Sequence, residues 1–238
     1  GALFRHHADP GLQALEAAAQ ALHPGQTGGV LRVGVLPTAA TRLFPRVALR
    51  LQALAPDIVL TMMTGSHSFL MRLLREGEID LILGRMPAAA EMAGLSFDHL
   101  YEEGVILAAR AGHPFAVAPV AVALAACPLI LPTEDAVIRR PVDDYLASLG
   151  LAGLRPAFRT VALAIGRGIV LQSDALWFIS RGVVADELDR GEMLVLPTGA
   201  AFLAGAVGVT LRQQPAPPPA TELLIRLARE TVREGIGP

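Results

Sequence analysis

Residues 31–85 read LRVGVLPTAATRLFPRVALRLQALAPDIVLTMMTGSHSFLMRLLREGEIDLILGR, and in this stretch short apolar runs alternate with amphipathic ones. The short runs predict β-strands, and the segments between them, with apolar residues at every third or fourth position, predict helices. Strands that alternate with helices in this way favour a parallel sheet with right-handed crossovers. The predicted strands are 31–36, 58–63 and 81–83, and the predicted helices start after Thr41 and Ser68.

The remainder of the chain repeats this alternation more loosely. Each half is too small for an α/β domain of ordinary size. We therefore expect two lobes joined by two crossing strands, with a cleft between them. In this part, strands are predicted at 129–131, 158–161, 176–180, 194–196 and 207–211, and helices at 141–149, 162–172, 182–190 and 220–232.

The composition excludes several classes of protein. Of the 238 residues, 53% are hydrophobic and 18% are charged, which excludes an intrinsically disordered chain. The formal net charge is −2, whereas a compact nucleic-acid-binding module is strongly basic, so these residues are not expected to bind nucleic acid by themselves. The single cysteine, Cys127, excludes an internal disulfide and any metal site built from several cysteines.

Two long uncharged segments, 115–132 and 193–211, resemble membrane spans in their hydropathy alone. Proline and glycine residues interrupt both, so we expect short buried strands and turns instead, and no membrane partner. The first ten residues lack the apolar stretch of a signal peptide. Together with the absence of disulfides, this favours a cytoplasmic protein.

The opening segment, residues 1–28, is predicted to contain one helix followed by a polar spacer. Asp9 is a suitable N-cap and Pro10 a suitable first residue. Leu15 and Leu22 belong to an apolar series at coiled-coil spacing. The helix either pairs with another chain, as a dimerisation element, or packs on its own domain.

No catalytic motif is found, and the protein is not expected to be an enzyme. The sequence contains no GxSxG, HExxH or P-loop motif. The adjacent acidic pairs Asp143–Asp144 and Glu102–Glu103 are expected to lie on solvated faces. No catalytic residue, metal ligand or cofactor is therefore assigned. The six histidines, scattered along the chain, are His6, His7, His23, His67, His99 and His113.

Small polar residues follow several predicted strands: Thr38, Ser66 with His67, Arg85, and Thr133. The carboxyl ends of the strands are where open α/β sheets bind ligands. Helix N-termini there offer free N–H groups and a partial positive charge, and an arginine can hold a carboxylate. This combination favours a small organic anion. Two alternatives stay open: the hydroxyl residues can be ordinary helix N-caps, and Arg85 can form a structural ion pair.

Two segments, LREGEIDLILGR (74–85) and LYEEGVILAARAGHP (100–114), resemble the effector-binding domain of LysR-type transcriptional regulators. The resemblance implies the fold of type 2 periplasmic binding proteins, with two Rossmann-like lobes. It also implies a linker helix in residues 1–28 and a helix-turn-helix before Gly1, which alone would contact DNA. Such regulators form homodimers or homotetramers. Lobe I would comprise 31–100 with 207–238, and lobe II would comprise 101–206.

The resemblance further implies an effector held between the lobes, whose binding changes the angle between them. The loop after the first strand and the GRMP segment resemble the branch that controls protocatechuate and related aromatic-acid catabolism, which suggests an aromatic carboxylate. The alternative is a solute-binding protein of a transport system. The residues implied in effector binding are Thr38, Ala39, Ser66, His67, Arg85, Pro132, Thr133, Ile165 and Val207.

Overall fold

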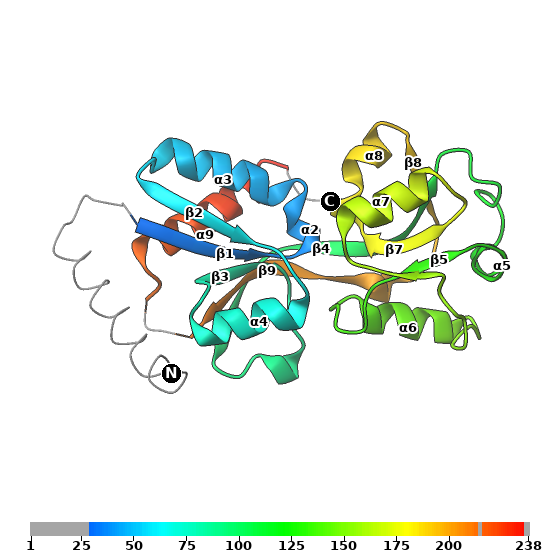
Figure 1. Cartoon of the computed structure of the whole chain (residues 1–238), viewed down its shortest axis with the longest axis horizontal. Helices are drawn as coiled ribbons and strands as arrows, with labels where there is room; N and C mark the ends of the chain where they lie inside the picture. The colour runs from blue at the N-terminus through cyan, green and yellow to red at the C-terminus, as the bar shows by residue number, and fades with distance from the viewer. Residues whose placement is uncertain (1–28, 214–215, 236–238) are drawn as a thin grey trace.

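One continuous mixed sheet runs through both halves of the protein in the computed structural model, which describes residues 29–213 and 216–235 (Figure 1). Within these ranges its nine strands follow the order β2-β1-β3-β9-β4-β7-β5-β6, and β8 pairs with β4. The strands are β1 (Gly29–Val35), β2 (Ile58–Met63), β3 (Leu81–Arg85), β4 (Leu95–Arg110), β5 (Leu129–Leu131), β6 (Phe158–Arg159), β7 (Leu176–Ser180), β8 (Met193–Leu196) and β9 (Ala204–Arg212).

Helices cover the sheet in each half (Figure 1). The α-helices are α2 (Pro37–Ala40), α3 (Leu43–Leu54), α4 (His67–Glu76), α5 (Val120–Ala126), α6 (Arg139–Ser148), α7 (Leu163–Leu171), α8 (Ala185–Asp189) and α9 (Pro219–Arg233). Short 3₁₀ helices are η1 (Ala89–Glu91), η2 (Arg181–Val183) and η3 (Ala201–Leu203).

Each lobe has its own hydrophobic core. In lobe I, β1 pairs in parallel with β2 and β3. Successive residues of a strand face opposite sides of the sheet, so Leu81 and Leu83 of β3 pack with α3 and α9, and Ile82 packs with α4. In lobe II, β5 pairs in parallel with β6 and β7, around the buried rings of Trp177 and Phe178.

Strands β4 and β9 connect the lobes (Figure 1). They pair antiparallel over residues 95–104 and 204–212, and β4 then continues into lobe II between β7 and β8. A register shift between His99 and Tyr101 introduces a β-bulge into β4. The predicted α/β fold with two lobes and two connecting strands is confirmed.

Two helical regions differ from the sequence-based prediction. Residues 37–40, predicted as a loop, form α2, with Pro37 in its first turn, where the absence of an N–H breaks no hydrogen bond. The helix predicted over 182–190 is divided into η2 and α8. Val183 and Val184 lie at the division, and β-branched side chains of this kind fit a helix interior poorly.

One strand is shorter than predicted, and another, β4, had no predicted bounds. The strand predicted at 158–161 is only the two-residue β6. Strand β4 spans sixteen residues, and its polar middle section between the lobes lacks the single apolar face that marks a strand in a sequence. The lobe boundaries predicted at residues 100 and 207 fall within β4 and β9. The linker helix predicted for residues 1–28 lies outside the described residues.

The two long uncharged segments form short elements. Segment 115–132 contains α5 and β5, and segment 193–211 contains β8, η3 and most of β9. Across the residues that the structure describes, no helix has both the length and the apolar character needed to cross a membrane.

Trp177 in β7 is fully buried and packs directly on α7. A Cβ atom at Gly166 would lie 2.6 Å from Cη2 and 2.7 Å from Cε2 of the Trp177 ring, so a glycine is needed at this contact. Gly168, further along the same helix, is different, because the nearest atom to a Cβ there is Gln172 Nε2 at 3.8 Å.

Gly166→Ala is expected to lower the free energy of unfolding by about 1–3 kcal/mol, since the added methyl overpacks the core against Trp177. Gly168→Ala is the matched control and should raise it by about 0.5–1 kcal/mol through higher helix propensity. Urea unfolding monitored by tryptophan fluorescence measures both. Equal effects of the two substitutions would contradict this packing.

Candidate functional site

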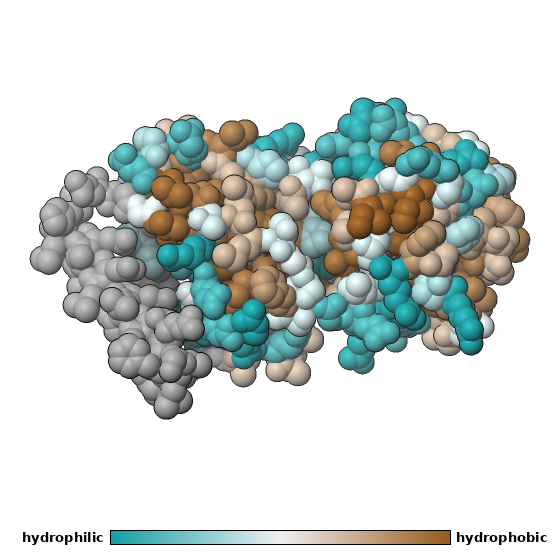
Figure 2. All heavy atoms as spheres, in the orientation of Figure 1, coloured by the Kyte–Doolittle hydropathy of each residue, from teal (hydrophilic) through white to brown (hydrophobic). Residues whose placement is uncertain are grey.

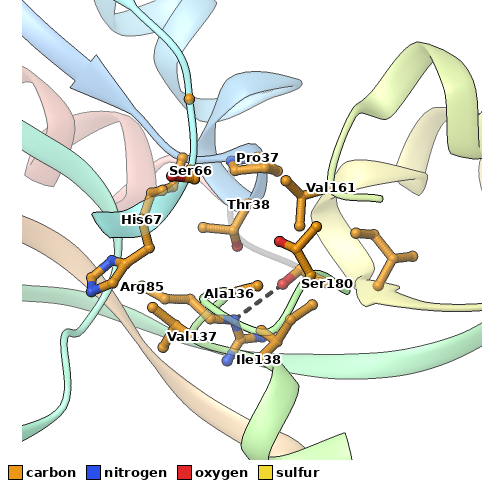
Figure 3. A pocket seen from close by; sticks show the side chains of 14 residues that line it. Pro37, Thr38, Ser66, His67, Arg85, Ala136, Val137, Ile138, Val161 and Ser180 are labelled. Carbon is orange, nitrogen blue, oxygen red and sulfur yellow. Dashed lines mark hydrogen bonds between the residues drawn. The ribbon is translucent and has the colours of Figure 1, made fainter. Parts of the chain in front are cut away.

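A cavity of about 460 Å³, counting its open mouth, lies between the two lobes (Figure 3). Both lobes contribute to it, so its shape depends on the angle between them. Its lining is Leu36, Pro37, Thr38, Gly65, Ser66, His67 and Arg85 from lobe I, and Thr133, Ala136, Val137, Ile138, Val161, Ile179 and Ser180 from lobe II.

Five of the nine residues predicted for the site line this cavity: Thr38, Ser66, His67, Arg85 and Thr133. They lie at or just after the ends of β1, β2, β3 and β5. The parallel strands β1, β2 and β3 end at a common edge in lobe I, and β5 runs in the opposite direction, so its carboxyl end faces them from lobe II. This geometry brings residues that are distant in sequence to one place.

The other four predicted residues lie outside the cavity lining. Ala39 and Val207 are fully buried. Pro132 is buried, and its carbonyl accepts a hydrogen bond from Arg139 Nη1 at 3.0 Å. Ile165, on α7, is 58% exposed. In this arrangement these residues either support the walls from behind or face solvent.

Ser66 and His67 begin α4. Ser66 is its N-cap, with the hydroxyl accepting a hydrogen bond from the Phe69 N–H at 3.3 Å. The His67 ring is turned away from the middle of the cavity (Figure 3), and its Nε2 lies 3.1 Å from both carboxylate oxygens of Glu91. Within the described residues, His67 Nδ1 is buried without a hydrogen-bond partner. Ser66 therefore caps α4 and His67 connects it to η1, and both residues form part of the wall.

Arg85 is buried and links three segments. Its Nε donates to Ser180 Oγ at 3.1 Å (Figure 3), and its Nη2 donates to the Glu103 carbonyl at 3.0 Å. The Glu103 carboxylate lies 3.8 Å from Nη2. Burial lowers the pKa of Arg85, and the charge of Glu103 opposes this effect. Arg85 thus forms a structural ion pair, the alternative left open by the sequence, and lines the cavity as well.

Glu103 is the main residue that the sequence analysis missed. Its predicted solvent exposure is wrong, because it is 1% exposed. Its Oε2 accepts a hydrogen bond from the Thr38 hydroxyl, and its Oε1 accepts one from the Gly182 N–H at 2.7 Å. Burial raises the pKa of Glu103, and the hydrogen bond from Thr38 and the charge of Arg85 oppose the rise. A single carboxylate therefore connects lobe I, through Thr38, with lobe II, through Gly182.

The alternation of β4 contains a signal for this burial. Residues two apart on a strand face the same side, and Glu103 shares its side with the buried Val105 and Leu107. Its partners come from distant segments, so sequence spacing cannot reveal them. Two glycines make room for the pair: a Cβ at Gly182 would collide with Glu103 Oε1, and one at Gly205 would lie 2.8 Å from Arg85 Nη1.

Polar contacts join the lobes away from the buried pair as well. The Ser68 hydroxyl of lobe I donates to Asp135 Oδ2 of lobe II at 3.0 Å. Arg42, at the start of α3, donates from Nε to Asp186 at 2.8 Å and pairs with Asp189 of α8. The hydrogen bond to Asp189 raises the pKa of Arg42. The structure therefore has the two lobes in direct contact.

The cavity combines two kinds of chemistry. The hydroxyl groups of Thr38 and Ser66 and the Arg85 guanidinium belong to its wall in lobe I. In lobe II, the aliphatic side chains of Ile138, Val161 and Ile179 lie beside the hydroxyl residues Thr133 and Ser180. Such a surface can orient a polar group at one end of a ligand and enclose an apolar body at the other. Among the described residues, no group of three His, Cys, Asp or Glu side chains could hold a metal ion.

Comparison with known proteins identifies the family. Residues 24–233 match the model of the LysR substrate binding domain. The HTH-type transcriptional regulator PcaQ of Agrobacterium fabrum (strain C58 / ATCC 33970) is 35% identical over 238 residues, which cover 98% of this chain and 76% of that protein. The regulator YdcI of Escherichia coli (strain K12), itself uncharacterized, is 27% identical, with 98% of this chain and 76% of that protein covered.

Solved structures share the fold. A full-length OxyR variant from Pseudomonas aeruginosa has a TM-score of 0.70 at 22% identity, covering 94% of this chain and 76% of that one. The cofactor-binding domain of the Cbl transcriptional regulator has a TM-score of 0.70 at 19% identity, covering 88% of this chain and 94% of that one. The relatives are transcriptional regulators and not enzymes, and the transport alternative is not supported. The chain belongs to the LysR-type transcriptional regulators and contains the ligand-sensing, substrate-binding domain of that family.

Proposed function

We propose that the interlobe cavity binds a small organic anion, a carboxylate with an aromatic or aliphatic body. The supporting observation is that Arg85 and Thr38 share one cavity with the apolar side chains of Ile138, Val161 and Ile179. Cationic and hydroxyl donors hold a carboxylate by charge-assisted hydrogen bonds, and the apolar side chains enclose the hydrocarbon part.

The ligand acts on the angle between the lobes. A molecule that touches both walls gains its full contacts only when the lobes are closed, so it favours that state. The contacts of Ser68 with Asp135 and of Arg42 with Asp186 would form and break in the same movement. A differential affinity of about 1.4 kcal/mol suffices to shift the balance between the states tenfold.

The protein works as a homodimer or homotetramer in the cytoplasm. Apolar side chains gather over β1 and β2 and over α7 on the face shown in Figure 2. Val59 and Met62 of β2 are 61% and 57% exposed, and Ile165 of α7 is also exposed. Exposed patches of this kind mark protein–protein interfaces. Contact with DNA belongs to a helix-turn-helix segment of the kind named in the relatives, and not to these residues, whose formal net charge is only −2.

Benzoate and adipate are expected to bind at millimolar or lower concentration, and benzamide, with the ring but no charge, at least about tenfold more weakly than benzoate. Isothermal titration calorimetry measures the affinities. Thr38→Val removes one donor and should weaken carboxylate binding about tenfold. Ala136→Phe should abolish binding by filling the cavity, since Ala136 lines it.

Ala147→Phe is the matched control for the bulky substitution, because Ala147 is exposed on α6, outside the cavity lining. It should bind carboxylates as the parent chain does. Unchanged carboxylate affinity in both Thr38→Val and Ala136→Phe would show that the ligand does not occupy this cavity.

Arg42→Met removes the ion pairs between α3 and α8 and should open the lobes in part of the population. The pairs are partly exposed, so their loss should destabilise the closed state by about 0.2–1 kcal/mol, equivalent to an increase of about 1.4- to fivefold in the Kd for benzoate. Small-angle scattering should show a larger radius of gyration. Arg72→Met, which breaks the Arg72–Glu76 pair within α4, is the control and should change neither quantity.

A further inference from the structure

An internal carboxylate already uses the groups that an anionic ligand would need. Glu103 Oε2 accepts a hydrogen bond from the Thr38 hydroxyl and lies 3.8 Å from Arg85 Nη2. Both donors belong to the cavity lining, whereas Glu103 itself does not. Glu103 thus lies directly behind the polar wall of the cavity.

Arg85 is the cation that faces Glu103 in this buried network. The other groups around the carboxylate are neutral: the Thr38 hydroxyl on α2, Ser180 at the end of β7, and the Gly182 N–H on η2. Strand β9 places Gly205 opposite Glu103, without a charge. On β4 itself, Tyr101 is a neutral phenol near the carboxylate, and the side chain of Glu102 is 60% exposed.

A ligand carboxylate that enters the cavity therefore finds the charge of Arg85 already neutralised by Glu103. Two carboxylates that share one guanidinium in a buried site repel each other, and one of them takes up a proton. Thr38 can serve both: its hydroxyl oxygen accepts a hydrogen bond from protonated Glu103 while its O–H donates to the ligand. The proton comes from solvent, and no bond other than hydrogen bonds is made or broken.

We propose that Glu103 competes with a carboxylate ligand for Thr38 and Arg85, so that the ligand enters the cavity together with one proton. This inference rests on the proposed binding of a carboxylate in the cavity. Glu103 is then a positioning residue that makes effector affinity depend on pH.

The electrostatics of the ligand-free protein favour this coupling. Burial raises the pKa of Glu103, against the opposing effects of Thr38, Arg85 and Gly182. The group is therefore easier to protonate than an exposed glutamate. Ligand affinity should be highest at low pH, where Glu103 is neutral, and should fall once the pH exceeds the Glu103 pKa of the free protein.

The experiment measures benzoate and adipate binding by calorimetry between about pH 5 and about pH 9, in two buffers with different ionisation enthalpies. For the parent chain, the Kd should rise about tenfold per pH unit in the upper part of this range, with uptake approaching one proton. Glu103→Gln keeps the shape of the side chain and an acceptor for the Gly182 N–H. The affinity of this variant for benzoate and adipate should be independent of pH, and at high pH it should exceed that of the parent chain. Glu102→Gln, on the exposed neighbour, should titrate like the parent.

The outcomes separate this inference from the proposed function. If the parent chain binds a carboxylate without taking up a proton, the proposed role of Glu103 is wrong. The same holds if Glu103→Gln takes up as many protons as the parent chain. In both cases the cavity remains the proposed ligand site. Binding of neither benzoate nor adipate at millimolar concentration, to the parent or to Glu103→Gln, overturns the carboxylate site and this inference with it. Circular dichroism establishes that each variant is folded before the titration.

Discussion

The buried pairing of Arg85 with Glu103 constrains the rest of the structure, because both side chains lie where the lobes meet. Burial disfavours the charge on each group, lowering the pKa of Arg85 and raising that of Glu103. Hydrogen bonds from Thr38 and Gly182 and to Ser180 offset part of this cost. Removing one member of such a pair costs about 3–5 kcal/mol, since the other is left buried and unpaired. The segments that supply these groups must therefore fold together.

This requirement explains the uneven character of the cavity. Thr38 and Arg85 of lobe I and Ser180 of lobe II belong to the cavity lining and to the network around the buried carboxylate, and the aliphatic residues Ile138 and Ile179 belong to the core around Trp177. Gly182 and Gly205 are required for the same reason, as a side chain at either position would contact the ion pair. The buried pair thus accounts for Thr38 and Arg85 in the cavity wall and for the two glycines beside them.

Most of the fold could be predicted from the sequence, because periodicity is a local property. The apolar residues of β1, β3 and α3 recur at the intervals that their elements require. The site was predictable where residues follow strand ends, as Thr38 and Arg85 do. Glu103 was missed because its neighbours come from α2, β3 and η2, and its adjacent partner Glu102 is exposed. Ile165 is exposed and lies outside the cavity lining, and a helix start in the sequence gives no indication of which face reaches the cavity.

The pairing of β4 with β9 has a consequence for the order in which the chain can fold during synthesis. The core of lobe II is built from residues 105–203, one uninterrupted stretch, so it is complete as soon as that stretch has left the ribosome. Lobe I begins first but needs Val209 and the apolar face of α9, which are made last. Lobe I is therefore synthesised first but completes its core after lobe II. Its apolar surface stays exposed until β9 and α9 have been synthesised.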